Sequence, residues 1–136
     1  YSSAISQCDI VIGNDVEFGV VAGNHLDGLN YATQLVTKTP EIVIYKNGEF
    51  GSKTLTKNKQ FDTGVFPVQA IKPTGAGDSF MGGLIAGLAN CMTLEEAVIQ
   101  GSACAALVVT RVACSTAMPF QTELSEFLKI NTLSQI

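Results

Sequence analysis

A short stretch of small residues carries a carboxylate placed where it could act on a phosphate. Residues 75–78 read Gly-Ala-Gly-Asp and precede a run of small and apolar residues that predicts a helix over 79–89. Amides at the start of a helix point outward and carry part of its positive dipole, so they can bind an anion, and glycine lets the ligand approach closely. Asp78 beside such an anion could accept the proton of an attacking hydroxyl group. Asp78 could also only cap the helix, and the loop by itself leaves both interpretations open.

Other motifs fit the same residues less well. A dinucleotide-binding fingerprint needs glycine where Phe80 stands, and a nucleophile elbow needs glycine at Met81. A Walker-type phosphate loop needs Gly-Lys-Ser/Thr, whereas residues 51–54 have these types in another order and fall in an expected strand. A nucleophilic Ser79 would need a downstream histidine as base, but the only histidine of the chain, His25, lies upstream. We therefore set these four activities aside.

Composition excludes several classes of protein. The chain has 136 residues, of which 46% are hydrophobic and 15% charged, so it can bury a core and is not a disordered chain. Eight Lys and Arg against twelve Asp and Glu give a net charge of −4, which lacks the basic field that nucleic-acid binding needs. The longest apolar run, 103–109, is too short to span a bilayer, and no basic segment precedes an apolar stretch at the start. We expect neither a nucleic-acid partner nor a membrane segment.

The cysteines show no paired spacing. Free thiols in a reducing cytoplasm are therefore the expected state, rather than disulfides or a zinc site. The four residues are Cys8, Cys91, Cys104 and Cys114.

Strand and helix patterns alternate along the chain. β-branched apolar runs predict strands, periodic apolar residues predict helices, and Asn47-Gly48 predicts a hairpin turn. Residues 93–96 match a helix capping box, and no regular element is expected over 57–67. This order favours an α/β fold with a mainly parallel sheet. The expected strands are 9–13, 41–45, 51–56 and 68–71, and the expected helices are one beginning at Asp15, 24–36, 79–89, 94–112 and 122–130.

Taken together and in this order, the segments resemble the C-terminal part of the PfkB, or ribokinase-like, carbohydrate kinase family. Residues 9–17 resemble a strand followed by an Asn-x-x-Glu motif, and 42–51 a strand and glycine turn beneath the nucleotide. Residues 74–83 resemble the second family signature, and 102–119 the terminal helix and loop that line the adenine pocket. The resemblance implies a three-layer α/β/α fold of which this chain carries the C-terminal half, as a single partial domain over 1–136.

The resemblance also implies roles for residues at matching positions. Asp78 would be the general base for a sugar hydroxyl, and the amides of Gly75, Ala76 and Gly77 would stabilise charge on the transferring phosphoryl group. Asn14 and Glu17 would organise Mg²⁺ and the phosphates, with Glu17 acting through water. A turn at Asn14 and a solvated helix face at Glu17 remain the alternatives. The residues expected to contact ATP are Asn14, Gly48, Gly51, Gly77 and Ser102.

Two positions depart from the family pattern. Many members have an acidic residue of a potassium site where Lys72 stands, and Ala117 has no side-chain oxygen at a further ligand position. Potassium activation is therefore doubtful. The Lys72 ammonium could supply positive charge there instead, or lie on the surface.

Within the family, residues 72–74 and 114–119 resemble the inositol-catabolism branch. Those enzymes use ATP to phosphorylate 5-dehydro-2-deoxy-D-gluconate at its 6-hydroxyl. Fructokinase, ribokinase and 2-keto-3-deoxygluconate kinase share the glycine loop and remain alternatives, as does a non-catalytic nucleotide-binding module.

Family members are longer, and their N-terminal portion supplies further strands, most sugar contacts and a lid. We therefore expect this chain to leave an unpaired sheet edge and an apolar face, and to form a homo-oligomer or associate with a missing N-terminal portion. We also expect negligible kinase turnover from residues 1–136 alone.

Overall fold

A computed structural model of the chain describes residues 2–135. They form two compact units, one ending at Thr63 and one running from Gly64 to Gln135. Each unit has its own apolar core, and each is described by itself below.

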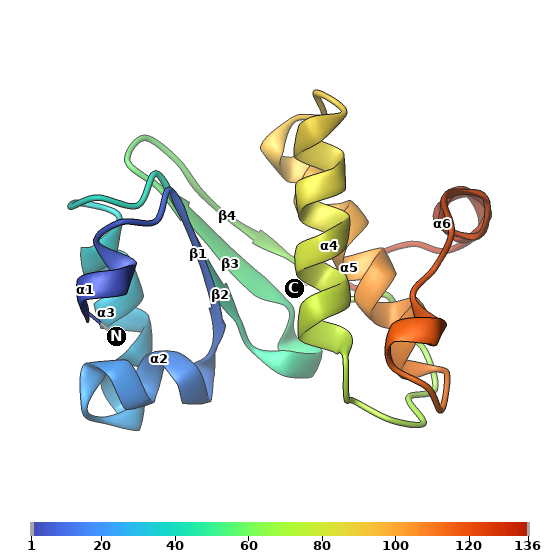
Figure 1. Ribbon diagram of the computed structural model, residues 1–136, viewed down its shortest axis with the longest axis horizontal. Helices are drawn as coiled ribbons and strands as arrows, with labels where there is room; N and C mark the ends of the chain where they lie inside the picture. Colours follow the sequence, from blue (N-terminus) through green and yellow to red (C-terminus); the bar gives the residue numbers. More distant parts are fainter. Residues whose placement is uncertain (1, 136) are drawn as a thin grey trace. The chain divides into compact units, whose positions relative to one another are not determined.

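The first unit is a four-stranded sheet with helices against one face (Figure 1). The strand order is β1-β2-β3-β4, with β1 and β2 parallel and the other two pairs antiparallel. Its elements are α1 (Ser2–Ile5), β1 (Ile10–Asn14), α2 (Asp15–Ala22), a 3₁₀ turn (His25–Asp27), α3 (Gly28–Leu35), β2 (Ile42–Lys46), a second 3₁₀ turn (Gly48–Phe50), β3 (Ser52–Thr56) and β4 (Gln60–Thr63).

The alternation of side chains along the strands decides which face is covered. Val43 pairs with Val11 on one side and Leu55 on the other, so these three side chains share a face. Phe18 of α2 and Leu35 of α3 pack against this face and are buried. The crossover from β1 to β2 through α2 and α3 makes that pair parallel, whereas the short connections after β2 and β3 reverse the chain.

The second unit is helical. Its elements are α4 (Ala76–Ala89), α5 (Leu94–Val109), a third 3₁₀ turn (Ser115–Ala117) and α6 (Gln121–Ile130). α4 and α5 lie side by side (Figure 1) and approach closely through glycine. A Cβ on Gly83 would lie 2.7 Å from Cys104 Sγ, and one on Gly101 would lie 2.8 Å from the Phe80 carbonyl oxygen. A second cluster of buried side chains, including Phe66, Cys104 and Leu124, joins α5 to α6.

The structure confirms the α/β class and corrects several details. The described sheet is mixed, not mainly parallel, because only one of its three strand pairs is parallel. β4 forms where no element was expected, and the strand predicted over 68–71 is absent. The helix predicted to begin at residue 79 begins at Ala76, and the helix predicted over 24–36 is split into a 3₁₀ turn and α3. The helix predicted over 94–112 ends at Val109.

The four cysteines are free thiols, as predicted. Among residues 2–135, no helix is both long and apolar enough to cross a membrane.

Candidate active site

The glycine turn of the second unit opens directly into the first turn of α4. Gly75 is the N-cap and has φ 91°, a left-handed conformation that glycine adopts without strain. This turn places Ala76, Gly77 and Asp78 at the first three helical positions. The predicted anion-binding residues are therefore the beginning of the helix itself, rather than a loop before it.

Two amides of this first turn are unpaired. The amide of Ala76 donates to the Pro73 carbonyl at 3.2 Å, and that of Ser79 donates to the Gly75 carbonyl at 2.9 Å. Within residues 2–135, no hydrogen-bond acceptor faces the amides of Gly77 and Asp78, and no side chain caps the helix. Helix amides in this state bind anions, because they are unsatisfied donors at the positive end of the dipole.

Comparison with the other helices shows that Asp78 does not act as a cap. The third position of α2, α5 and α6 is Glu17, Glu96 and Glu123 respectively, and each carboxylate accepts a hydrogen bond from the main-chain amide of its own N-cap residue. Asp78 holds the same position in α4 with a side chain one methylene shorter. It is exposed, and no residue of the described chain forms a hydrogen bond or ion pair with its carboxylate. The capping interpretation of Asp78 is therefore wrong.

The C-terminal end of α5 and the segment that follows it hold the turn. The amides of Ile71 and Lys72, just before it, donate to the Val109 carbonyl at 2.7 and 3.1 Å. Cys114 also lies beside the turn, with Sγ 3.8 Å from the Thr74 carbonyl oxygen and 3.7 Å from Lys72 Nζ. Lys72 is half-buried, and its contact with Cys114 places its ammonium group near the glycine turn.

Asn14 and Glu17 lie in the first unit and form the capping box of α2. Asn14 Oδ1 accepts from the Glu17 amide at 2.8 Å, and Glu17 Oε2 accepts from the Asn14 amide at 2.7 Å. Glu17 is exposed on the first turn of α2, as the alternative of a solvated helix face expects, whereas Asn14 is the N-cap of this helix rather than part of a simple turn. The capping box leaves one carboxylate oxygen of the exposed Glu17 without a hydrogen bond from the described chain.

Gly48 and Gly51 flank the 3₁₀ turn that joins β2 to β3. Their φ angles are 54° and 87°, and the Asn47 amide closes the loop on the Gly51 carbonyl at 2.8 Å. The sequence predicted a turn at Asn47-Gly48, and the structure forms a longer loop there. A Cβ on Gly48 would meet nothing within 4 Å, so this side of the loop is open.

Ser102 lies on α5 of the second unit. Its hydroxyl group donates to the Gly64 carbonyl at 3.3 Å, so the structure gives it a partner within the protein. A nucleotide contact by Ser102 stays a prediction. No group of three or more His, Cys, Asp and Glu side chains within residues 2–135 is arranged to hold a metal ion.

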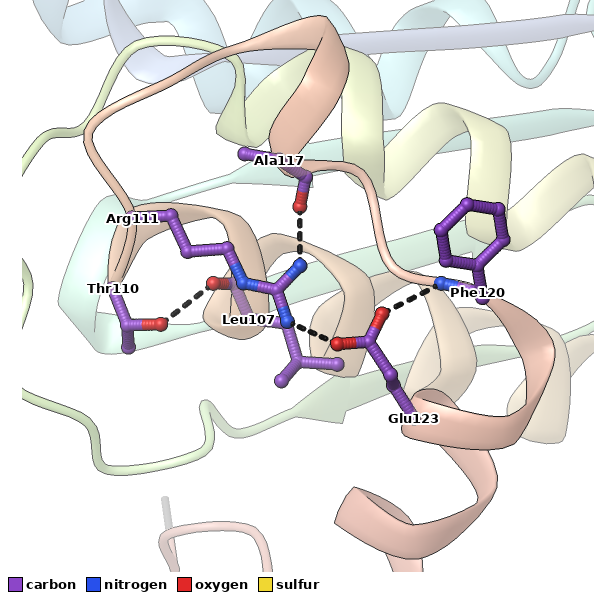
Figure 2. A network of polar contacts seen from close by, with 6 residues as sticks. All are labelled: Leu107, Thr110, Arg111, Ala117, Phe120 and Glu123. Carbon is purple, nitrogen blue, oxygen red and sulfur yellow. Dashed lines mark hydrogen bonds and ion pairs between the residues drawn. The ribbon is translucent and has the colours of Figure 1, made fainter.

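One residue near the turn escaped the sequence analysis. Arg111, the only arginine of the chain, binds the Ala117 carbonyl and the Glu123 carboxylate beside the 112–120 segment (Figure 2). A lone arginine directly after a long apolar helix is the pattern from which the sequence could have identified it.

An α/β protein with free helix amides next to an unpaired carboxylate has the parts of a phosphoryl-transfer site. Residues 1–121 match the pfkB family carbohydrate kinase profile, and the chain belongs to this family. It is 41% identical over 134 residues to the 5-dehydro-2-deoxygluconokinase of Photobacterium profundum, and 33% identical over 133 residues to that of Geobacillus kaustophilus. Each alignment covers 95% of this chain but 40% of the relative.

Solved structures give the same family. A ribokinase from Thermotoga maritima superposes with a TM-score of 0.86 at 31% identity, covering 92% of this chain and 43% of that one. A fructokinase from Vibrio cholerae in a form with fructose, ADP and calcium ion bound has a TM-score of 0.81 at 30% identity, covering 93% and 43%. A putative ribokinase II from E. coli in complex with ATP and Mg²⁺ has a TM-score of 0.82 at 26% identity, covering 93% and 41%. The ribokinase-like fold of the chain is thereby confirmed.

Proposed function

We propose that the protein carrying this chain transfers the terminal phosphoryl group of ATP to a hydroxyl group of a sugar or sugar acid. The observation that carries the proposal is the exposed Asp78 carboxylate, which has no partner in the described chain and adjoins two unpaired helix amides. ATP as donor is supported by the family and by the ATP complex of the E. coli structure.

The chain's residues would divide the reaction as follows. Asp78 accepts the proton of the sugar hydroxyl while the oxygen of that hydroxyl bonds to the terminal phosphorus of ATP. The bond between that phosphorus and ADP breaks in the same step. The amides of Gly77 and Asp78, with that of Gly75 as the sequence predicts, donate to the phosphoryl oxygens as negative charge develops. The Ala76 amide, which the sequence also predicts for this role, donates to the Pro73 carbonyl in the structure. Gly48, Gly51 and Ser102 are the proposed further contacts to the nucleotide.

Mg²⁺ would neutralise phosphate charge when bound. The capping box leaves Glu17 one free carboxylate oxygen, which suits a contact through a metal-bound water molecule, while Asn14 keeps its amide nitrogen for phosphate. The Lys72 ammonium beside the turn supplies positive charge, and we expect turnover without a requirement for potassium.

The names of the relatives favour 5-dehydro-2-deoxy-D-gluconate as the substrate, phosphorylated at its 6-hydroxyl. Fructose, ribose and 2-keto-3-deoxygluconate are the alternatives, because kinases of these sugars share the glycine loop. The four free thiols fit a reducing compartment, and we place the protein in the cytoplasm. We propose that the chain forms a homo-oligomer or associates with a missing N-terminal portion.

The test is Asp78→Asn in the whole protein, assayed against a panel of these acceptors. We expect kcat to fall by about 10²–10⁴-fold, with the affinity for ATP nearly unchanged. Glu126→Gln makes the same change of an exposed helical acid to an amide on α6 and should leave kcat unaltered. Full turnover by Asp78→Asn would contradict the general-base role. A wild-type protein that binds ATP but phosphorylates no acceptor would favour a non-catalytic binding module.

A second measurement addresses the length of the chain. Because these residues span 40% of the relatives, we expect residues 1–136 alone to give negligible turnover. Phosphorylation of an acceptor by this chain alone would contradict that expectation.

A further inference from the structure

The segment from 112 to 120 has little regular structure, yet it is fixed at several points. It contains only the 3₁₀ turn Ser115–Ala117 between α5 and α6. Arg111 stands immediately before it, its amide bonded to the Val108 carbonyl at 3.0 Å, so its side chain extends from a fixed helix end.

The guanidinium group of Arg111 links the middle of the segment to the helix that follows. Nη1 donates to the Ala117 carbonyl oxygen at 2.8 Å, and Nη2 donates to Glu123 Oε1 at 2.8 Å. Figure 2 draws both contacts as dashed lines. The other carboxylate oxygen of Glu123 accepts from the Phe120 amide at 3.0 Å. One cation therefore connects α5, the segment and α6. The planar guanidinium suits this double role, and a lysine ammonium would not reproduce it.

The same segment touches the glycine turn. A Cβ built on Gly75 would lie 3.6 Å from Cys114 Cβ and 3.7 Å from Cys114 Cα, which is ordinary van der Waals contact. Cys114 Sγ also lies 3.8 Å from the Thr74 carbonyl oxygen and accepts from Lys72 Nζ at 3.7 Å. The amides of Ile71 and Lys72, just before the turn, donate hydrogen bonds to the carbonyl of Val109, which lies two residues before Arg111. The turn is therefore supported by the end of α5 and by Cys114.

We propose that Arg111 is a positioning residue for the Gly75–Asp78 turn. It holds the 112–120 segment so that Cys114 supports the turn, and the amides of Gly77 and Asp78 keep their direction. This inference rests on the proposed function, because it assigns the turn a phosphoryl group to stabilise. Arg111 itself bonds only protein groups in the described chain and acts on the chemistry through Cys114.

Loss of this support should act mainly on the chemical step. Amides that stabilise a transition state are effective only when held in place, and displacement by about 1 Å can cost up to about 100-fold in rate. In the whole protein we expect Arg111→Gln to lower kcat by about ten- to 100-fold, with the KM for the sugar nearly unchanged. Arg111→Lys keeps the positive charge near Glu123 but loses the fork, so it should recover only part of kcat.

The control is Lys129→Gln, which removes an exposed positive charge from α6 and should leave kcat unaltered. Rates are compared per folded molecule and well below the melting temperature, so that lost stability does not count as lost chemistry. Where Arg111→Gln does not fold, Arg111→Lys and Glu123→Gln carry the test, and both should reduce kcat. Unchanged kcat in the folded variants would overturn the inference.

A readout that needs no turnover separates this inference from the proposed function. In ¹⁵N-labelled protein, the amide resonances of Gly77 and Asp78 should shift in Arg111→Gln and stay in place in Lys129→Gln. Stationary resonances in Arg111→Gln overturn the positioning role even if the enzyme is active. If these resonances shift in Arg111→Gln but the wild-type protein has no kinase activity, the positioning role is supported and the proposed function is contradicted.

Discussion

The side-chain amide of Gln100 donates a hydrogen bond of 2.8 Å to the main-chain carbonyl of Gly83, and both residues are buried. Gln100 lies on α5 and Gly83 on α4, so a side chain of one helix binds the backbone of the other. This contact depends on the absence of side chains where the helices cross, at Gly83, Gly87 and Gly101. The site helix α4 is thus fixed to α5 by close backbone contact.

Adjacent glycines of α4 offer a matched test of that contact. Gly83→Ala would place its Cβ 2.7 Å from Cys104 Sγ and 3.0 Å from Gly101 Cα, and we expect a loss of about 1–3 kcal/mol in stability. A Cβ on Gly82 would meet nothing within 4 Å, so Gly82→Ala should stabilise the helix by up to about 1 kcal/mol. Urea denaturation of both variants measures the difference. Equal effects of the two substitutions would contradict the close packing of α4 on α5.

The left-handed N-cap of α4 gives a second comparison. Gly75→Ala forces a side chain into φ 91°, which we expect to cost about 1–2 kcal/mol and to displace the turn. Gly23→Ala imposes a similar strain at φ 81°, at the end of α2 and with open space around it. Both should lower the melting temperature to a similar extent, but only Gly75→Ala should reduce kcat. A parallel fall in kcat for Gly23→Ala would show that strain alone, rather than turn geometry, limits activity.

The capping box of α5 predicts a dependence of stability on pH. Hydrogen bonds from the Thr93 amide and hydroxyl, both 2.8 Å, lower the pKa of Glu96 below its usual 4.5. A group whose pKa is lowered on folding stabilises the fold above its unfolded pKa, and this contribution is lost as pH falls through the folded value. As the pH is lowered below about 4.5, the melting temperature should therefore decrease, and it should decrease less steeply in Glu96→Gln. The same slope in wild type and variant would disprove the assignment to Glu96.

The thiols should differ in reactivity. Burial raises the pKa of Cys104 to about 11, so the thiolate that reacts is scarce near neutral pH. Cys8 and Cys91 are exposed. With iodoacetamide near pH 8, peptide mass spectrometry should find Cys8 and Cys91 alkylated first and Cys104 only after unfolding. Early labelling of Cys104 would mean that the α5–α6 core opens readily.

The sequence predicted those elements whose signals are local. The capping box at Thr93 and Glu96 marked the start of α5, and β-branched runs marked β1 and β2. β4 has a polar sequence and depends on its partner strand, where Lys53 pairs with Asp62 at 2.6 Å. Residues 68–71 have the composition of a strand. The amide of Ile71, the last of them, and that of the following Lys72 donate to the Val109 carbonyl of α5 instead of to a neighbouring strand.

The candidate site was predictable in its parts and not in its contacts. The Gly-Ala-Gly-Asp spacing indicated an anion-binding turn with Asp78 beside it. Whether that carboxylate caps its helix depends on the hydrogen bonds at the helix start, which only the structure gives. The roles of Arg111 and Cys114 depend on contacts between residues far apart in sequence, and no local pattern encodes them.

No side chain caps α4, so the stability of this helix and the proposed activity make opposite demands on the carboxyl group of residue 78. A glutamate at position 78 would be long enough to fold back onto the start of the helix, as the glutamates of α2, α5 and α6 do. It would increase the stability of the fold. The proposed proton acceptor would then be occupied by its own backbone. Selection for higher stability could therefore favour a substitution that abolishes the proposed activity. Such a trade-off is common where function requires an unsatisfied group.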